Sequence, residues 1–126
     1  MANFSYETIN QLIVIPVTLY GKHSNLNSRF ILDTGATRTV VDHGIVESLG
    51  YSARDGIGIS TVSSVVGKEQ GYRLQIEGFQ TLGKLVKNHE IVCHDLINQI
   101  EGLIGMSFLQ QFDWCLHPKE KKIAAT

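Results

Sequence analysis

The chain has 126 residues, 43% of them apolar, and its 12 acidic and 11 basic residues give a formal net charge of −1. This length suits one domain with a single core, spanning residues 1–126. A nearly balanced charge excludes a strong long-range attraction to nucleic acid or to an anionic membrane. The basic stretch Lys119–Lys122 is expected to be a solvated turn, so we expect no nucleic-acid partner.

Residues 1–10 are not expected to act as an export signal. Met1–Asn10 has neither a basic segment nor an apolar core of the kind found in signal peptides. The longest apolar run, Leu12–Val17, is too short to span a bilayer and contains Pro16. We therefore expect no membrane partner and a cytoplasmic location. In that compartment Cys93 and Cys115 are expected to stay reduced, as small buried hydrophobic side chains.

The first half of the chain predicts a strand pair followed by a short helix. Residues 11–20 and 29–32 are rich in β-branched and large apolar residues, and the polar segment 21–28 between them indicates a hairpin loop. After an extended segment at residues 40–41, residues 42–50 predict a helix with Asp42 as N-cap and Gly50 as its stop.

The second half predicts further hairpins. Alternating apolar residues indicate strands on both sides of a polar tip at 67–71, and another strand spans 84–93 after turns around Gly78 and Gly83. Near the end of the chain we expect a short buried strand at 103–105, a helical turn or two at 106–111, and a pair of strands at 112–116 and 122–125. The fold class expected is one mainly β domain with one or two short helices.

The most informative stretch is residues 30–37, in which Asp33 ends an apolar run and is followed by Thr34 and Gly35. A carboxylate at the end of a buried strand is costly unless it has a partner or a shifted pKa. The alternative is an ordinary turn, since an Asp-Thr-Gly triplet occurs by chance in roughly 2 or 3 chains of this length per hundred. A second apolar-apolar-glycine segment, Leu103–Gly105, about 70 residues later adds weight to the first.

Other chemistries are poorly supported. Residues 105–109 begin like a hydrolase nucleophile elbow but lack its closing glycine, and the Gly-Ile-Gly at 56–58 lacks the helix of a dinucleotide site. Four potential metal ligands match no standard zinc spacing and would alternate between two faces of a strand: His89, Cys93, His94 and Asp95. We expect no metal and no cofactor.

Two segments carry a resemblance to a known family. Phe30–Val41 resembles the catalytic strand and loop of the retropepsin-like aspartic proteases, and Gly102–Leu109 resembles their second signature of strand, glycine and helix. The hairpin between them occupies the place of the family's flap. The resemblance covers roughly Gln11 to the C-terminus.

The resemblance implies an aspartic endopeptidase with a closed, mainly β barrel that supplies one catalytic aspartate per subunit. A two-fold homodimer would then pair two Asp33 carboxylates, which share one proton and activate a water against a peptide bond of a polypeptide substrate. By the same likeness Thr34 braces the two loops across the dimer and Gly35 admits the substrate backbone. The implied subsite walls are Ile31, Ala36, Leu103 and Ile104, with Val65, Val66 and Gly67 near the tip of the flap.

Some positions depart from the family pattern. Retroviral members often carry an acid and an Arg-Asn or Arg-Asp pair where this chain has Thr37-Arg38 and Met106-Ser107, so the ion pairing between subunits must differ or be missing. Glu101 either lies near a subsite, where it would favour basic side chains, or is a solvated loop acid.

Two alternatives to an active protease stay open from the sequence. The first is a retropepsin-fold binding or scaffolding module without activity, because fold alone does not determine function. The second is an unrelated small β-barrel that binds a ligand.

Overall fold

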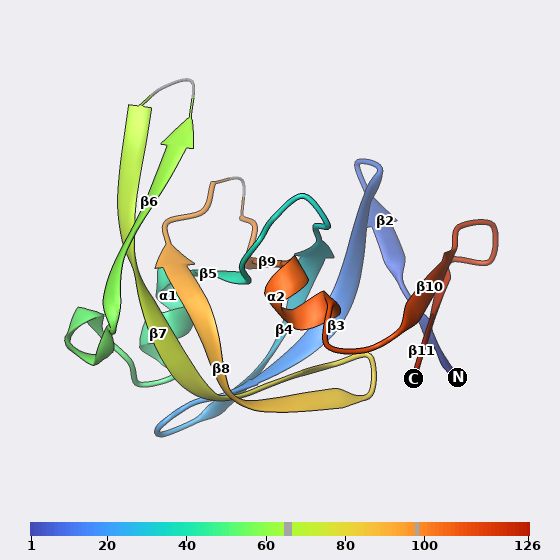
Figure 1. Ribbon diagram of the computed structural model, residues 1–126, viewed down its shortest axis with the longest axis horizontal. Helices are drawn as coiled ribbons and strands as arrows, with labels where there is room; N and C mark the ends of the chain where they lie inside the picture. Colours follow the sequence, from blue (N-terminus) through green and yellow to red (C-terminus); the bar gives the residue numbers. More distant parts are fainter. Residues whose placement is uncertain (65–66, 98) are drawn as a thin grey trace.

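The computed structural model describes residues 1–64, 67–97 and 99–126, and the side chains of residues 62–69 are outside the description. The chain is mainly β, as predicted, and has two short helices (Figure 1). The strands are β1 (Ala2–Ser5), β2 (Glu7–Ile9), β3 (Leu12–Tyr20), β4 (Asn25–Leu32), β5 (Val40–Asp42), β6 (Gly58–Ser64), β7 (Gly67–Thr81), β8 (Lys84–His94), β9 (Gly102–Ile104), β10 (Trp114–His117) and β11 (Lys122–Ala125). The helices are α1 (His43–Ser48) and α2 (Met106–Leu109), and a 3₁₀ turn spans Ala53–Asp55.

The larger sheet has the strand order β2-β3-β4-β9-β5-β8-β7-β6, and β7 also pairs with β3. Strand β9 lies between β4 and β5, although these two follow one another in the sequence. It runs parallel to β4, with Ile31 opposite Leu103, and antiparallel to β5, with Val40 opposite Leu103. This arrangement places the loop of residues 33–39 directly beside the segment that follows β9.

Three phenylalanine rings anchor the core beneath that loop. The Phe79 ring lies 5.6 Å from the Phe30 ring and 5.1 Å from the Phe108 ring, both in edge-to-face contacts. Such contacts contribute about 0.5–1.5 kcal/mol each beyond the burial of area. A Cβ at Gly102 would lie 2.3 Å from the Phe30 ring, so only glycine fits there. The core therefore fixes the end of β4 against β9 and α2.

Helix α1 begins and ends as the sequence predicts. One carboxylate oxygen of Asp42 accepts a hydrogen bond of 3.0 Å from the Gly44 amide, and the other accepts one of 2.9 Å from the Leu96 amide. Asp42 is therefore the N-cap. Gly50 has φ +92°, a left-handed conformation in which glycine ends a helix without steric cost.

Several sequence expectations need correction. Strand β4 begins at Asn25 rather than at residue 29, because its polar first half pairs with the end of β3. Gly78 lies inside β7 rather than in a turn, and the chain reverses at Leu82–Gly83, both with positive φ. Cys115 is exposed rather than buried, while Cys93 is buried, and both are free thiols.

The N-terminal ten residues form two strands that the sequence analysis did not predict. Strand β1 joins β11 and β10 in a three-stranded sheet of order β1-β11-β10, and β2 pairs with β3. The chain termini lie close together at this smaller sheet (Figure 1). In the part of the chain that the structure describes, no helix is long and apolar enough to cross a membrane.

Candidate active site

Asp33 stands immediately after the last residue of β4 and is held by main-chain hydrogen bonds. Its amide donates to the carbonyl oxygen of Ile104 at 3.0 Å, and its own carbonyl accepts from the Ala36 amide at 3.2 Å. The Gly35 amide donates to the carboxylate oxygen Oδ1 at 2.9 Å. The carboxyl group of the half-buried Asp33 is thus held in place, and its second oxygen, Oδ2, has no hydrogen-bond partner among the described residues.

The residues after Asp33 form a tight, mostly exposed turn. Thr34 and Gly35 are exposed and Ala36 is half-buried. A Cβ at Gly35 would lie 3.2 Å from Oδ1 of Asp33, closer than most side-chain contacts. Glycine therefore allows the backbone to fold over the carboxylate and donate its amide.

The start of α2 clamps this turn from the other side. The Met106 amide donates to the carbonyl oxygen of Ala36, and the Ser107 amide donates to that of Thr37, both at 2.8 Å. A Cβ at Gly105 would lie 2.3 Å from the carbonyl oxygen of Arg38. The glycine of the second signature is thus required because the loop backbone passes directly over it.

A buried polar pair supports the loop from beneath. Thr39 is fully buried, and its Oγ1 accepts a hydrogen bond of 3.4 Å from the Gly105 amide and lies 3.4 Å from Nε2 of His89. The His89 ring packs against Phe79 and Phe108, with centroids 5.3 and 5.8 Å away. Burial lowers the pKa of His89, with a smaller opposing effect of the Glu90 carboxylate. The imidazole is therefore neutral at neutral pH.

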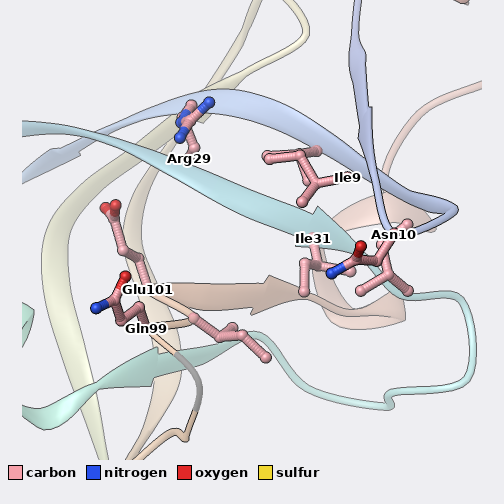
Figure 2. A pocket seen from close by; sticks show the side chains of 9 residues that line it. Ile9, Asn10, Arg29, Ile31, Gln99 and Glu101 are labelled. Carbon is pink, nitrogen blue, oxygen red and sulfur yellow. The ribbon is translucent and has the colours of Figure 1, made fainter.

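A cavity of about 340 Å³ adjoins the end of β4 (Figure 2). Its lining combines the hairpin of β2 and β3, strand β4 and the segment before β9. The residues are Ile9, Asn10, Leu12, Val14, Arg29, Ile31, Gln99, Ile100 and Glu101. Ile31 lines the cavity and stands two residues before Asp33 in the chain, at the end of β4. The cavity therefore lies along the strand that leads to Asp33.

The other residues expected in the site differ in how accessible they are to a substrate. Leu103 is half-buried beside Ile31, whereas Ile104 has no exposed surface and packs in the core, where its carbonyl positions Asp33. Gly67 opens β7 and pairs with Ser64. The expected flap residues Val65 and Val66 lie outside the described residues.

At the two positions that depart from the family pattern, Thr37-Arg38 and Met106-Ser107, polar groups make contacts within the same chain. Arg38 forms an ion pair with Glu90 on β8 of the same chain, and Arg73 lies 3.7 Å from that carboxylate. The Thr37 carbonyl oxygen accepts a hydrogen bond of 2.8 Å from the Ser107 amide, and Ser107 Oγ accepts one of 3.3 Å from the Thr39 amide. In residues 1–64, 67–97 and 99–126 no group of three or more His, Cys, Asp or Glu side chains is placed to hold a metal ion.

The support of the loop by Thr39 and His89, and the contribution of the β2–β3 hairpin to the cavity, were not predicted from the sequence. Thr39 and His89 are 50 residues apart. The alternation of Ala2, Phe4 and Tyr6 with polar residues is a strand signal that could have revealed the N-terminal strands. A buried histidine on a strand was visible only as a possible metal ligand. These contacts depend on pairings between distant strands, which local patterns do not encode.

The fold is that of the retropepsin-like family of aspartic proteases. The crystal structure of a retropepsin-like aspartic protease from Rickettsia conorii superposes with a TM-score of 0.75 at 18% identity, covering 98% of this chain and 98% of that chain. Residues 20–111 match the family described as gag-polyprotein putative aspartyl protease, and the chain belongs to that family. This membership excludes an unrelated β-barrel. A search of curated proteins gave no match.

Proposed function

We propose that this protein is an aspartic endopeptidase that hydrolyses peptide bonds. The observation that carries the proposal is the placement of the Asp33 carboxyl group. Its Oδ1 accepts a hydrogen bond of 2.9 Å from the Gly35 amide, and its Oδ2 has no hydrogen-bond partner among the described residues. Membership of an aspartyl protease family supports the same reaction. A catalytic acid needs this combination of rigid placement and access to a water molecule.

The reaction needs two such acids. Two carboxylates a few Å apart cannot both ionise cheaply, so a pair shares one proton. The ionised Asp33 acts as general base on a water held between the two groups, and that water attacks the scissile carbonyl carbon. The protonated Asp33 donates to the developing oxyanion, and the proton taken from water then reaches the leaving amine. The C–N bond breaks without a covalent enzyme intermediate.

The second acid comes from a second copy of the chain. Asp-Thr-Gly occurs once in the sequence, so a two-fold homodimer supplies the pair. The exposed Thr34 would hydrogen-bond across the dimer and brace the two loops. In the smaller sheet β11 is flanked by β1 and β10 of its own chain, so a partner strand can add only at the β1 or β10 edge.

The polypeptide substrate would lie across the two Asp33 groups. Ile31, Ala36 and Leu103 would contact its side chains, and Gly67, with Val65 and Val66, would cover it as a flap that excludes water. The cytoplasmic location stays a prediction of the sequence.

Mixed dimers test the shared site directly. Wild-type protein is titrated with an excess of Asp33→Asn protein, and cleavage of a peptide pool is followed. Each mixed dimer has one ionisable acid only, so the activity per wild-type chain should fall toward zero as the variant is added. Asp95→Asn is the matched control, because the Asp95 side chain is 91% exposed and lies outside the site. Unchanged activity under excess Asp33→Asn would contradict the shared site.

A further inference from the structure

The cavity along β4, whose lining includes Ile31 two residues before Asp33, has apolar walls that a substrate side chain could contact. Its apolar residues are Ile9, Leu12, Val14, Ile31 and Ile100. Two of them, Ile9 and Leu12, are 42% and 45% exposed in the single chain, so their apolar surface is open to contact with a substrate side chain. The volume of about 340 Å³ lies at the lower end of the range for ligand pockets. An elongated side chain with an apolar stem suits such walls.

Glu101 is a fixed part of this cavity rather than a solvated loop acid. Its carboxylate accepts a hydrogen bond from the hydroxyl of Ser28, which is buried on β4, and its main-chain carbonyl accepts from the Asp42 amide at 3.0 Å. Figure 2 shows Glu101 and Gln99 on one side of the cavity, with Ile31 and Asn10 on the other. A half-buried acid in a fixed position keeps a defined negative charge on the wall.

The charge of Glu101 has no close counterpart in the described part of the chain. Arg29 also lines the cavity, but its guanidinium lies 3.2 and 3.4 Å from the two carboxylate oxygens of Glu7. Among the side chains that the structure describes, no Lys, Arg or His lies within ion-pair distance of Glu101. The positive charge of Arg29 and the negative charges of Glu7 and Glu101 therefore leave an excess negative charge around the cavity.

We propose that Glu101 determines specificity by selecting a lysine or arginine side chain of the substrate in this cavity. The inference rests on the proposed function, because it names the substrate class of the same site. The aliphatic stem packs against Ile31 and Ile100, and the cationic end pairs with the Glu101 carboxylate. A charge-assisted contact in a half-buried place favours the cation by roughly 10- to 100-fold over an uncharged side chain of similar length.

The test compares peptides that differ at one position. A peptide library randomised near the scissile bond identifies the substrate position at which the side chain affects cleavage most. The kcat/KM is then measured for peptides with Lys, Arg, Met or Glu at that position. Lys and Arg should exceed Met by roughly 10- to 100-fold in the wild type. This comparison needs no substitution, so it decides the matter even where a variant folds poorly. Equal rates for Lys, Arg and Met, or a preference for Glu, would overturn the proposal.

A variant pair then assigns the preference to one residue. Glu101→Gln keeps an oxygen for Ser28 but removes the charge, so the advantage of Lys and Arg over Met should disappear. Glu120→Gln, in an exposed turn, should leave it intact. A preference for Lys and Arg that survives Glu101→Gln would overturn the assignment. A preference for Glu that is lost in Arg29→Gln would identify Arg29 as the selecting residue instead.

Binding separates failure of the specificity from failure of the catalysis. The Asp33→Asn protein lacks the proposed catalytic acid, so its affinity for the same peptides is measured by calorimetry without turnover. Tighter binding of the Lys and Arg peptides, weakened in Asp33→Asn/Glu101→Gln, supports the proposal even if cleavage fails. Binding without any preference for a basic side chain overturns the specificity alone. Absence of both binding and cleavage contradicts the proposed function and this inference together.

Discussion

The amide nitrogen of Met106 lies 2.8 Å from the carbonyl oxygen of Ala36, to which it donates a hydrogen bond. This bond joins the turn after Asp33 to the start of α2, two segments about 70 residues apart in the sequence. It forms only because β9 inserts between β4 and β5. The geometry of the loop that carries Asp33 therefore depends on the last quarter of the chain.

Gly105→Ala should damage both stability and activity. The added methyl group would lie 2.3 Å from the carbonyl oxygen of Arg38 and 2.9 Å from that of Ala36, so the loop must move away from α2. We expect the free energy of unfolding, measured by chemical denaturation, to fall by about 1–3 kcal/mol. We also expect kcat to fall under conditions in which the variant is still fully folded. Gly44→Ala, in α1, is the control, since the nearest atom to its added methyl group would be a side-chain carboxylate oxygen of Asp42 at 3.3 Å. Equal behaviour of the two variants would contradict the clamp.

The stability should fall in acid because of His89. Burial lowers the pKa of His89 below the ordinary value of 6.5, so the unfolded chain takes up a proton at this residue before the folded chain does. The stabilising contribution is complete above pH 6.5 and is lost as the pH falls from 6.5 through the folded-state pKa. Each unit by which the pKa is lowered corresponds to about 1.4 kcal/mol.

Unfolding free energies measured between about pH 7 and pH 5 check this effect. His89→Gln has no titrating group, so its stability should decline less over that range than that of the wild type, whatever its stability at neutral pH. His117→Gln, at an exposed position on β10, should follow the wild-type curve. An identical slope for wild type and His89→Gln would show that the imidazole is not held neutral.

The local features were predictable because each has a local physical signature. The β3 strand, the N-cap of Asp42 and the stop at Gly50 follow from apolar patterning and from capping chemistry. The position of Asp33 at a strand end follows in the same way from the apolar run before it.

The contacts that complete the site were not predictable from local patterns. Strand β2 has only three residues, all of them exposed, so only its pairing with β3 reveals it, and the cavity that it helps to line was missed with it. The contact of Thr39 with His89 joins residues 50 apart. Ile104, expected in a subsite, is buried because it faces the core from β9.

Activity should depend on dimer concentration. Because each chain contributes one Asp33, dilution below the dimer dissociation constant should make the rate fall with the square of the protein concentration. Initial cleavage rates over a dilution series, with sedimentation of the same samples, check this relation. A rate proportional to concentration in samples that sediment as monomers would exclude the shared site.

The most direct test of the account is cleavage of a peptide library between about pH 4 and 7, the range in which a shared-proton pair should titrate, by wild type and Asp33→Asn in parallel. The Asn amide cannot take a proton from the water, so we expect Asp33→Asn to lower the cleavage rate by about 10²- to 10⁴-fold. The far-UV circular dichroism spectrum and the dimeric state should be unchanged. Undiminished cleavage by Asp33→Asn, or none by folded, dimeric wild type, would contradict an aspartic protease, and the second result would favour a binding module.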